Sequence, residues 1–171
     1  AENLYATPLS LADELPRLAA QNRLLFAEQR PRLAATPFPP VSEGPRTLVD
    51  VGTGTGILAI AAAKLGAKTL FACDTDEDSV KIARENAVLN NVNWIEFADG
   101  PLVEDAPVYD FVFANLTVDV IVPILELLLA KTGSILLLSG ILETQKTIIT
   151  EALEKFQIPN FKFEISGEWI S

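Results

Sequence analysis

The chain has 171 residues, 49% of them hydrophobic, and its 23 acidic and 13 basic residues give it a net charge of −10. This length suits one folded domain with a sizeable core, and the acidic balance argues against the basic groove of a nucleic-acid-binding protein. A single cysteine, Cys73, and the absence of histidine exclude an internal disulfide and a metal site built from cysteine and histidine.

Residues 1–46 are punctuated by prolines. Between them, residues 15–29 carry leucine and phenylalanine near helical spacing, which predicts a helix that ends before Pro31. Residues 36–44 are rich in proline and end in glycine, which is typical of a loop. We therefore predict two parts, an N-terminal helical and linker segment over residues 1–46 and a ligand-binding domain over residues 47–171.

The apolar runs of the chain are too short to cross a membrane. None reaches the ~18 residues that a membrane span needs, and the first 20 residues carry acids where a signal peptide would be basic and then apolar. We expect a cytoplasmic protein that does not bind membranes. Its negative charge would suit a basic protein partner, and the sequence predicts no particular oligomeric state.

A strand, a glycine turn and a helix follow one another in the middle of the chain. Residues Thr47–Val51 are apolar and β-branched, as in a buried strand. The turn Gly52–Gly56 (GTGTG) breaks this strand, and residues 57–65 form an apolar, alanine-rich run that favours a helix ended by Gly66. This unit is typical of the first half of a nucleotide-binding βαβ motif, in which glycines let a ligand approach the backbone.

Strands and helices alternate through the rest of the chain. We expect strands at residues 69–73, 93–97, 109–114 and 134–138, helices at 76–91, 117–131 and 142–156, and a terminal hairpin with strands at 160–165 and 168–170. Thr117 is placed to cap its helix, Pro123 is tolerable only near the first turn of that helix, and Gly133 would end it. This alternation predicts an α/β fold with a doubly wound, mostly parallel sheet and an antiparallel C-terminal hairpin.

Polar residues stand immediately after four of the expected strands. They are the glycine turn after the first strand, Asp74 after the second, Asp99 after the third and Asn115 after the fourth. In a doubly wound sheet the ligand binds beyond the carboxyl ends of the strands, at the switch point beside the first strand. The sequence therefore predicts that these residues share one site.

The glycine spacing leaves more than one nucleotide ligand open. A P-loop would need a lysine and a serine or threonine after its last glycine, whereas Gly56 is followed by Ile57 and Leu58. The dinucleotide pattern G-x-G-x-x-G/A is met by residues 54–59, GTGILA. Against a dinucleotide, Asp50 would set a carboxylate near the pyrophosphate, and the turn has no lysine or arginine to offset that charge.

S-adenosylmethionine suits these residues better, because it has no phosphate and carries a net positive charge. Free N–H groups of the glycine turn would bind its carboxylate, and Asp50 with nearby backbone carbonyls would hold its ammonium group. Asp74, 20 residues after Gly54, is placed to accept hydrogen bonds from both ribose hydroxyls, and Asp99 could accept one from the adenine amino group. Carboxylates around a cation are electrostatically favourable.

Several segments resemble one protein family, in the same order along the chain. They are residues 50–67, 73–76 (CDTD), 83–87 (ARENA), 114–116 (ANL), 138–142 (LSGIL) and 167–169 (GEW). The family is that of the bacterial, PrmA-like methyltransferases that methylate amines of a large-subunit ribosomal protein, and the resemblance covers roughly residues 47–171. The glycine motif marks only the broad class of S-adenosylmethionine-dependent methyltransferases, whereas SGIL and GEW are more specific.

The resemblance implies a seven-stranded, Rossmann-like class I methyltransferase fold that acts as the catalytic domain. It places Asn115 beside the methyl group and the incoming amine, where the Asn115 amide oxygen and the backbone carbonyls near Leu116 would orient the amine. The expected cofactor-binding residues are Asp50, Gly52, Thr53, Gly54, Thr55, Gly56, Asp74, Thr75, Asp99, Gly100 and Asn115.

Three functions stay open at this point. The first is N-methylation of protein amines, with a ribosomal protein as the expected substrate. The second is a non-catalytic, trimmed or engineered module that binds S-adenosylmethionine, because Pro37–Pro40 stand where the family has a histidine-containing lid loop, and residues 1–46 are too few for its substrate-recruiting domain. The third is a nicotinamide-dependent oxidoreductase, which rests on GTGILA alone.

Overall fold

A computed structural model describes residues 47–158 and 161–171. The helix expected at residues 15–29 and the loop expected at residues 36–44 lie outside the described residues, so the division of the chain into two parts stays a prediction. The strands are β1 (Thr47–Val51), β2 (Thr69–Asp74), β3 (Glu96–Asp99), β4 (Tyr109–Asn115), β5 (Thr132–Ser139), β6 (Ile141–Leu142), β7 (Ile165–Ser166) and β8 (Trp169–Ile170). The helices are α2 (Ile57–Lys64), α3 (Glu77–Leu89), α4 (Val118–Ala130) and α5 (Lys146–Lys155), with a 3₁₀ turn at Glu143–Gln145.

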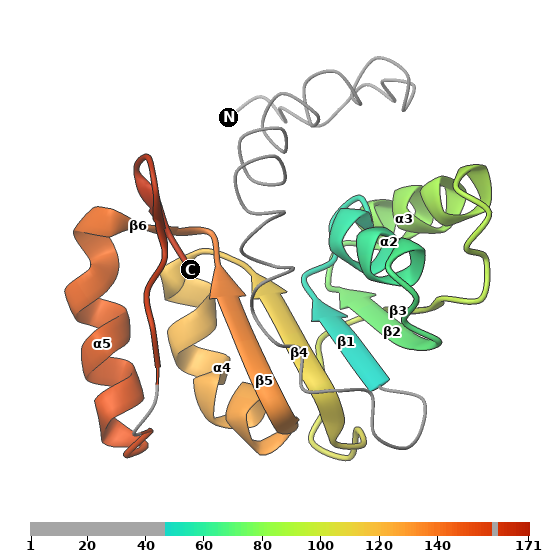
Figure 1. Cartoon of the computed structure of the whole chain (residues 1–171). Coiled ribbons are helices and arrows are strands. Elements are labelled where there is room, and N and C mark those ends of the chain that lie inside the picture. The colour runs from blue at the N-terminus through green and yellow to red at the C-terminus, as the bar shows by residue number, and fades with distance from the viewer. Residues whose placement is uncertain (1–46, 159–160) are drawn as a thin grey trace. The chain divides into compact units, whose positions relative to one another are not determined.

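Five parallel strands form the main sheet in the order β3-β2-β1-β4-β5 (Figure 1). β1 lies at the centre, and the direction of winding reverses between β1 and β4. The doubly wound sheet predicted from the alternation of strands and helices is therefore confirmed. Such a sheet has its switch point beside β1, where the glycine turn begins.

The seven-stranded sheet is not confirmed, because the last three strands form a sheet of their own. β8 pairs in antiparallel fashion with β6 and with β7, which confirms the C-terminal hairpin, although its first strand covers Ile165–Ser166 rather than residues 160–165. Gly140, with a φ of 82°, turns the chain between β5 and β6, a conformation that glycine adopts at little cost. The helix expected from residue 142 begins only at Lys146, since β6 and the 3₁₀ turn precede it.

Alternate residues of the strands pack on opposite faces of the main sheet. In β1, Leu48 packs in a cluster with α2 and α3, whereas Val49 packs in a cluster with α4. A third cluster joins α4 to α5 through the buried side chains of Ile121 and Ile149. Burial on both faces explains why these strands appear in the sequence as continuous apolar runs.

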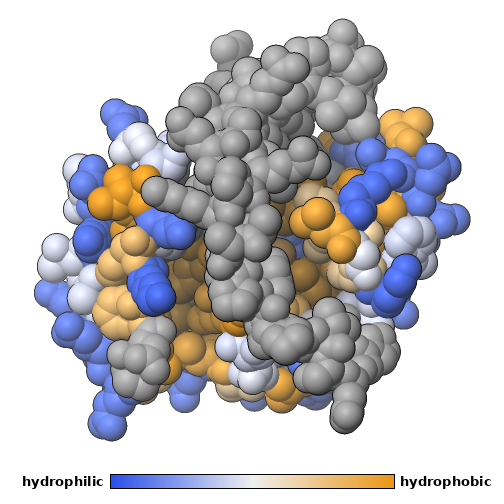
Figure 2. All heavy atoms as spheres, in the orientation of Figure 1, coloured by the Kyte–Doolittle hydropathy of each residue, from blue (hydrophilic) through white to orange (hydrophobic). Residues whose placement is uncertain are grey.

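Polar and charged side chains lie over the outer surfaces of α3 and α5, at the right and left edges of Figure 2. In α3 the apolar residues Val80, Ala83 and Ala87 are buried on one face, as predicted, and Asp76 caps the helix by accepting a hydrogen bond from the Asp78 N–H. Within residues 47–158 and 161–171, no helix is both long enough and apolar enough to span a membrane.

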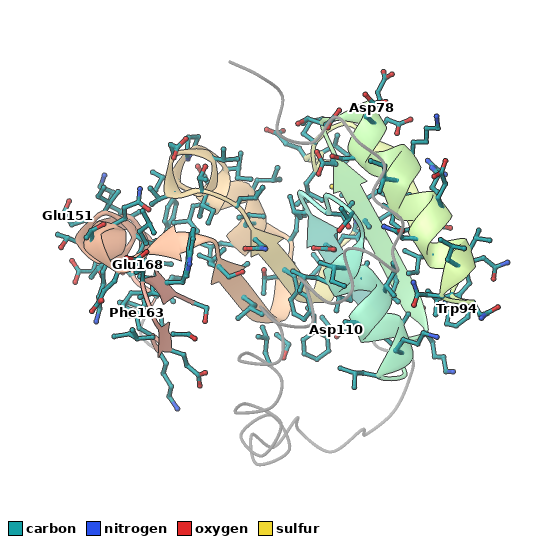
Figure 3. The ribbon with its side chains drawn as sticks, turned by 90° about the horizontal axis from the view of Figure 1, so that it is seen from above. Asp78, Trp94, Asp110, Glu151, Phe163 and Glu168 are labelled. Atoms are coloured by element: carbon teal, nitrogen blue, oxygen red, sulfur yellow. The ribbon has the colours of Figure 1, made fainter. Side chains whose placement is uncertain are left out.

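The third strand begins later than predicted, at Glu96 rather than at residue 93. Val92 and Ile95 are buried in the cluster shared with α2 and α3, while Trp94 between them is 47% exposed and lies beyond the end of α3 opposite to Asp78 (Figure 3). The segment predicted as a strand at residues 93–97 therefore begins as a packed loop. Hydrophobic periodicity alone cannot distinguish such a loop from a short strand.

The features expected along and at the ends of α4 are only partly found in the structure. Thr117 stands at the N-cap of α4 as predicted, but its side chain makes no capping hydrogen bond. Pro123 lies in the second turn of α4 rather than near the first, so the helix forgoes one backbone hydrogen bond there. Gly133 lies within β5, where a Cβ would approach the Tyr109 carbonyl oxygen to 3.2 Å. Close approach of two strands, and not the end of a helix, explains this glycine.

Candidate functional site

The carboxyl ends of the parallel strands bring the predicted site residues to one edge of the main sheet. Asp74 ends β2 and is the register partner of Asp99 at the end of β3. Asn115 ends β4 and is the register partner of Ser139 at the end of β5. Because β1 lies between β2 and β4, the glycine turn that follows β1 stands between these two polar pairs. The view from above in Figure 3 looks onto this edge.

The three glycines of the turn have positive φ angles, 72° at Gly52, 54° at Gly54 and 81° at Gly56, which other residues rarely adopt. A Cβ at Gly52 would lie 2.2 Å from the Leu116 side chain, and one at Gly56 would lie 3.0 Å from the Cβ of Ala83. A Cβ at Gly54 would meet no atom of the described residues within 4 Å. The outer glycines therefore permit packing within the protein, whereas the middle one borders open space that a ligand could enter.

Most N–H groups of the turn are used within the protein, so the expectation of free donors is wrong for them. The N–H groups of Gly52 and Thr53 donate to the carbonyl oxygen of Cys73 on β2, at 2.9 and 3.0 Å. The N–H of Gly54 donates to Asp74 Oδ2 at 2.8 Å. The physical reason is that the turn folds back over the end of β2, which satisfies its donors without a ligand.

The far side of the turn is held by α3. The side-chain amide of Asn86 donates to the carbonyl oxygen of Thr55 at 2.9 Å. The N–H of Thr55 finds no acceptor among the described residues. Among the N–H groups of the turn, it is therefore the donor left for an anionic group of a ligand.

Asp50 lies inside the protein rather than on its surface. Its side chain is 1% exposed, and its Oδ2 accepts hydrogen bonds from the Thr53 hydroxyl at 2.7 Å and from the Ala59 N–H at 3.1 Å. Its Oδ1 is buried without a hydrogen-bond partner in the described part of the chain. Asp50 therefore ties β1 to the turn and to the start of α2, while its contact with the ammonium group of a ligand stays a prediction.

Burial raises the pKa of the Asp50 carboxyl to about 6, against the opposing hydrogen bonds from Thr53 and Ala59 and with a smaller contribution from the negative charge of Asp74. Burial, with the charge of Asp50, likewise raises the pKa of the Cys73 thiol to about 11. The ionisable side chains of Asp50, Cys73 and Asp74 therefore lie close enough to one another near the turn to disfavour their negative charges. A positively charged ligand at this edge would offset their repulsion.

We expect Asp50 to make the protein more stable as the pH falls through 6. An acid whose pKa is higher in the folded than in the unfolded state binds its proton more tightly when folded, so its contribution is fully present below its unfolded pKa of 3.8 and is lost as the pH rises through about 6. This difference corresponds to about 3 kcal/mol. Asp50→Asn mimics the protonated group and should remove the effect.

The measurement is urea-induced unfolding of both proteins between pH 4 and pH 8. The free energy of unfolding of the wild type, relative to that of Asp50→Asn, should decline by up to about 3 kcal/mol as the pH rises from 4 to 7. Parallel pH profiles for the two proteins would show that Asp50 does not titrate in this range.

Asp74 is the acid that the structure links directly to the turn. Its Oδ1 accepts a hydrogen bond from the Asp76 N–H at 3.0 Å, and its other oxygen holds the turn as described above. The carboxylate keeps further lone pairs for a ligand. Thr75 and Asp99 are exposed at the same edge, and the N–H of Gly100 donates to the Asp74 carbonyl oxygen at 2.7 Å.

Asn115 is exposed at the end of β4, and its amide oxygen accepts a hydrogen bond from the Ser139 hydroxyl at 3.0 Å. The next residue, Leu116, donates its N–H to the Ser139 carbonyl oxygen at 3.0 Å and covers Gly52 with its side chain. The structure therefore places Asn115 beside the glycine turn, with Leu116 between them.

Two residues at this edge, Asn86 and Ser139, were not predicted to take part in the site, and for Leu116 the sequence predicted a role of nearby backbone carbonyls but not the contact of its side chain with Gly52. Asn86 and Ser139 lie in the ARENA and SGIL segments, which supported the family resemblance without a role for either residue. Their partners are 31 and 24 residues away along the chain. A single sequence carries no local signal for contacts at this separation.

The residues at this edge fit a cationic nucleoside better than a ligand with phosphates. The space beside Gly54 is open, Asp74 borders the turn, and the unpartnered oxygen of Asp50 adds buried negative character. The turn contains no lysine or arginine that could neutralise a pyrophosphate. The arrangement suits a ligand that has hydroxyl groups to donate and a positive charge.

Comparison with known proteins points to one family. The family model described as ribosomal protein L11 methyltransferase (PrmA) matches residues 37–171. The ribosomal protein L11 methyltransferase of Campylobacter lari is 39% identical over 132 residues, which cover 76% of this chain and 46% of that protein. The crystal structure of ribosomal protein L11 methylase from Lactobacillus delbrueckii subsp. bulgaricus matches with a TM-score of 0.70 and 32% identity, over 83% of this chain and 76% of that chain.

A more distant structure shares the fold alone. Magnesium protoporphyrin IX methyltransferase from Synechocystis PCC 6803, solved with bound SAM, matches with a TM-score of 0.65 and 18% identity, over 95% of this chain and 81% of that chain. The chain spans less than half the length of the curated relatives it matches, with 46%, 43% and 41% for three of them. The activities of those longer proteins do not pass to this chain by similarity alone.

Proposed function

We propose, because the chain belongs to the ribosomal protein L11 methyltransferase family, that it binds S-adenosylmethionine and transfers the methyl group to an amino nitrogen of a protein. Ribosomal protein L11, which the names of the relatives specify, is the proposed acceptor. A ribosomal acceptor would place the protein in the cytoplasm.

The observation that carries this proposal is the open space beside Gly54 next to the carboxylate of Asp74. The two residues are joined by a hydrogen bond of 2.8 Å, so a ribose lying against Gly54 would be within reach of the Asp74 oxygens. Asp99, the register partner of Asp74, would accept from the adenine amino group. The N–H of Thr55, which has no acceptor among the described residues, would donate to the carboxylate of the cofactor.

The same geometry argues against a dinucleotide, although GTGILA satisfies its pattern. Asp74 holds the N–H of Gly54, which a dinucleotide-binding turn would offer to a pyrophosphate. The carboxylate would also repel phosphate groups. Asp50 adds to this repulsion from below the turn, because it lies within the same cluster of acids.

The main contribution of the protein to methyl transfer would be to position the acceptor amine. Bound S-adenosylmethionine would supply a methyl group on a sulfonium, whose sulfur would keep the electron pair of the broken C–S bond and leave as the neutral thioether of S-adenosylhomocysteine. The amide oxygen of Asn115 would accept a hydrogen bond from the neutral amine and so direct the nitrogen lone pair toward the methyl carbon. Correct positioning of two reactants can lower a barrier by several kcal/mol without any acid or base, up to about 7–11 kcal/mol in the best cases. The proton released by the methylated amine passes to solvent.

Two measurements on the 171-residue chain test the proposal. Calorimetry with S-adenosylmethionine measures binding, and transfer of a radiolabelled methyl group to purified ribosomal protein L11 measures activity. Binding together with transfer is the expected result. Binding without transfer to L11 or to other basic proteins would leave a cofactor-binding module, and binding of a nicotinamide dinucleotide in place of S-adenosylmethionine would contradict the proposal.

A further inference from the structure

We propose that Ser139 and Gly140 shape the acceptor side of the site. Ser139 is a positioning residue that acts through the amide of Asn115, and Gly140, which has no side chain, allows the two oxygens that would accept the amine N–H groups to lie close together. This inference rests on the proposed methyl transfer. It assigns a role to the SGIL segment, which the sequence singled out and the proposed function does not use.

Ser139 holds both the backbone and the side chain at the end of β4. It is the register partner of Asn115, and its carbonyl oxygen accepts the N–H of Leu116 at 3.0 Å. Its hydroxyl donates to Asn115 Oδ1 at 3.0 Å. The hydrogen bond from the Ser139 hydroxyl is not part of the backbone pairing between β4 and β5, so its effect is to orient the Asn115 side chain.

The orientation of the Asn115 amide matters because the side chain is exposed. The last torsion of an asparagine side chain has a broad energy minimum, so an exposed amide without a partner samples many directions. An amide oxygen has two lone pairs. The Ser139 hydroxyl occupies one of them and fixes the amide plane, which leaves the other lone pair for an N–H of the acceptor amine.

Gly140 lies where two acceptor oxygens converge. A Cβ on Gly140 would lie 2.7 Å from the Leu116 carbonyl oxygen and 2.9 Å from Asn115 Oδ1. Both oxygens therefore pack against the backbone of Gly140, and any side chain at this position would displace at least one of them. An amine that donates one N–H to each of them has its lone pair directed away from both, which is the arrangement that attack on a methyl carbon requires. A methyl group on residue 140 would crowd these oxygens.

A double-mutant cycle tests whether Ser139 acts through Asn115. Single-turnover transfer to ribosomal protein L11 and calorimetry with S-adenosylhomocysteine are measured for Ser139→Ala, Ser139→Thr, Asn115→Ala and the double variant Asn115→Ala/Ser139→Ala. Ser139→Ala should slow transfer roughly tenfold, as expected for one lost hydrogen bond, with unchanged affinity for S-adenosylhomocysteine. Ser139→Thr should restore the rate, and Ser139→Ala should have no further effect once Asn115 is replaced.

The control for Gly140 is a second glycine that also has a positive φ angle. Gly167 also has a positive φ, 63° against 82° at Gly140, but a Cβ there would meet none of the described atoms within 4 Å. Both Gly140→Ala and Gly167→Ala therefore place alanine at a positive φ angle, with the same kind of cost in stability. Only Gly140→Ala adds a methyl group against the Leu116 carbonyl oxygen and Asn115 Oδ1. Gly140→Ala should slow transfer by about 100-fold, whereas Gly167→Ala should keep the wild-type rate.

The outcomes separate this inference from the function on which it rests. Wild-type protein that binds S-adenosylhomocysteine but methylates nothing would overturn both. If the wild type is active, three results would each overturn the role of Ser139 alone. The first is an unchanged transfer rate in Ser139→Ala, and the second is an equal decrease in rate when Ser139 is replaced in the wild type and in Asn115→Ala. The third is a loss of affinity for S-adenosylhomocysteine as large as the loss of rate. Equal rates for Gly140→Ala and Gly167→Ala would overturn the role of Gly140.

Discussion

Replacement of Gly54 by alanine is expected to remove cofactor binding while the protein stays folded. The Cβ of alanine would meet no atom of residues 47–158 and 161–171 within 4 Å, so the variant should lose only about 1–2 kcal/mol of stability, the cost of the left-handed φ of 54°. The same Cβ would stand in the space assigned to the cofactor. Because a displacement of about 1 Å in a tight site can cost 100-fold, the affinity for S-adenosylmethionine should fall at least that much. Calorimetry measures the affinity, and urea unfolding measures the stability.

Gly66 provides the matched control for Gly54. It also has a positive φ, of 102°, and a Cβ there would likewise meet nothing within 4 Å in the part of the chain that the structure describes. It follows α2, at the other end of that helix from the turn. Gly66→Ala should therefore cost similar stability and leave cofactor affinity unchanged. If Gly54→Ala bound the cofactor as tightly as Gly66→Ala does, the open face of Gly54 would not be the cofactor site.

Replacement of Asp74 by alanine is expected to weaken cofactor binding at least as strongly. The carboxylate holds the N–H groups of Gly54 and Asp76 at 2.8 and 3.0 Å, and it is the proposed acceptor for the ribose hydroxyls. Hydrogen bonds to a charged group contribute about 1.5–3 kcal/mol each, so the loss of the ribose contacts should lower the affinity for S-adenosylmethionine by about 100-fold or more. Calorimetry on the folded variant measures this change.

Asp76 is the control for Asp74, because it is an acid two residues away with a structural role alone. Its side chain caps α3 by accepting hydrogen bonds from the Asp78 N–H and the Ser79 hydroxyl. Asp76→Ala should cost about 1 kcal/mol of stability and leave cofactor affinity unchanged. Equal losses of affinity in Asp74→Ala and Asp76→Ala would mean that general negative charge, and not a contact with ribose, holds the cofactor at this edge.

Much of the fold could be predicted because its signals are local. The run TLVDV marks β1, the alternating glycines mark the turn, and the acidic start with Val80, Ala83 and Ala87 on one face marks α3. Predictions were wrong where local signals have two meanings. Gly133 suggested the end of a helix but lies in a strand, and Ile95 suggested a strand but belongs to a packed loop.

The candidate site could be predicted in its location but not in its internal contacts. Parallel strands carry whatever follows them to the same edge, so Asp74, Asp99 and Asn115 could be grouped from their positions alone. The expected free amides of the turn were wrong for Gly52, Thr53 and Gly54, because the end of β2 satisfies them. This pairing depends on how the turn folds back on a neighbouring strand, which no property of the turn sequence specifies.

The sequence by itself determined the order of the strands and helices, the position of the glycine turn and the acidic character of the site, because propensity, periodicity and charge act over a few neighbouring residues. Only the tertiary structure decided that Gly52 and Gly56 pack inward while Gly54 borders open space, and that Asp50 is buried. It also decided that Ser139 meets Asn115. These features depend on atoms that lie far apart in the chain and come within a few ångströms of each other only when the sheet has formed.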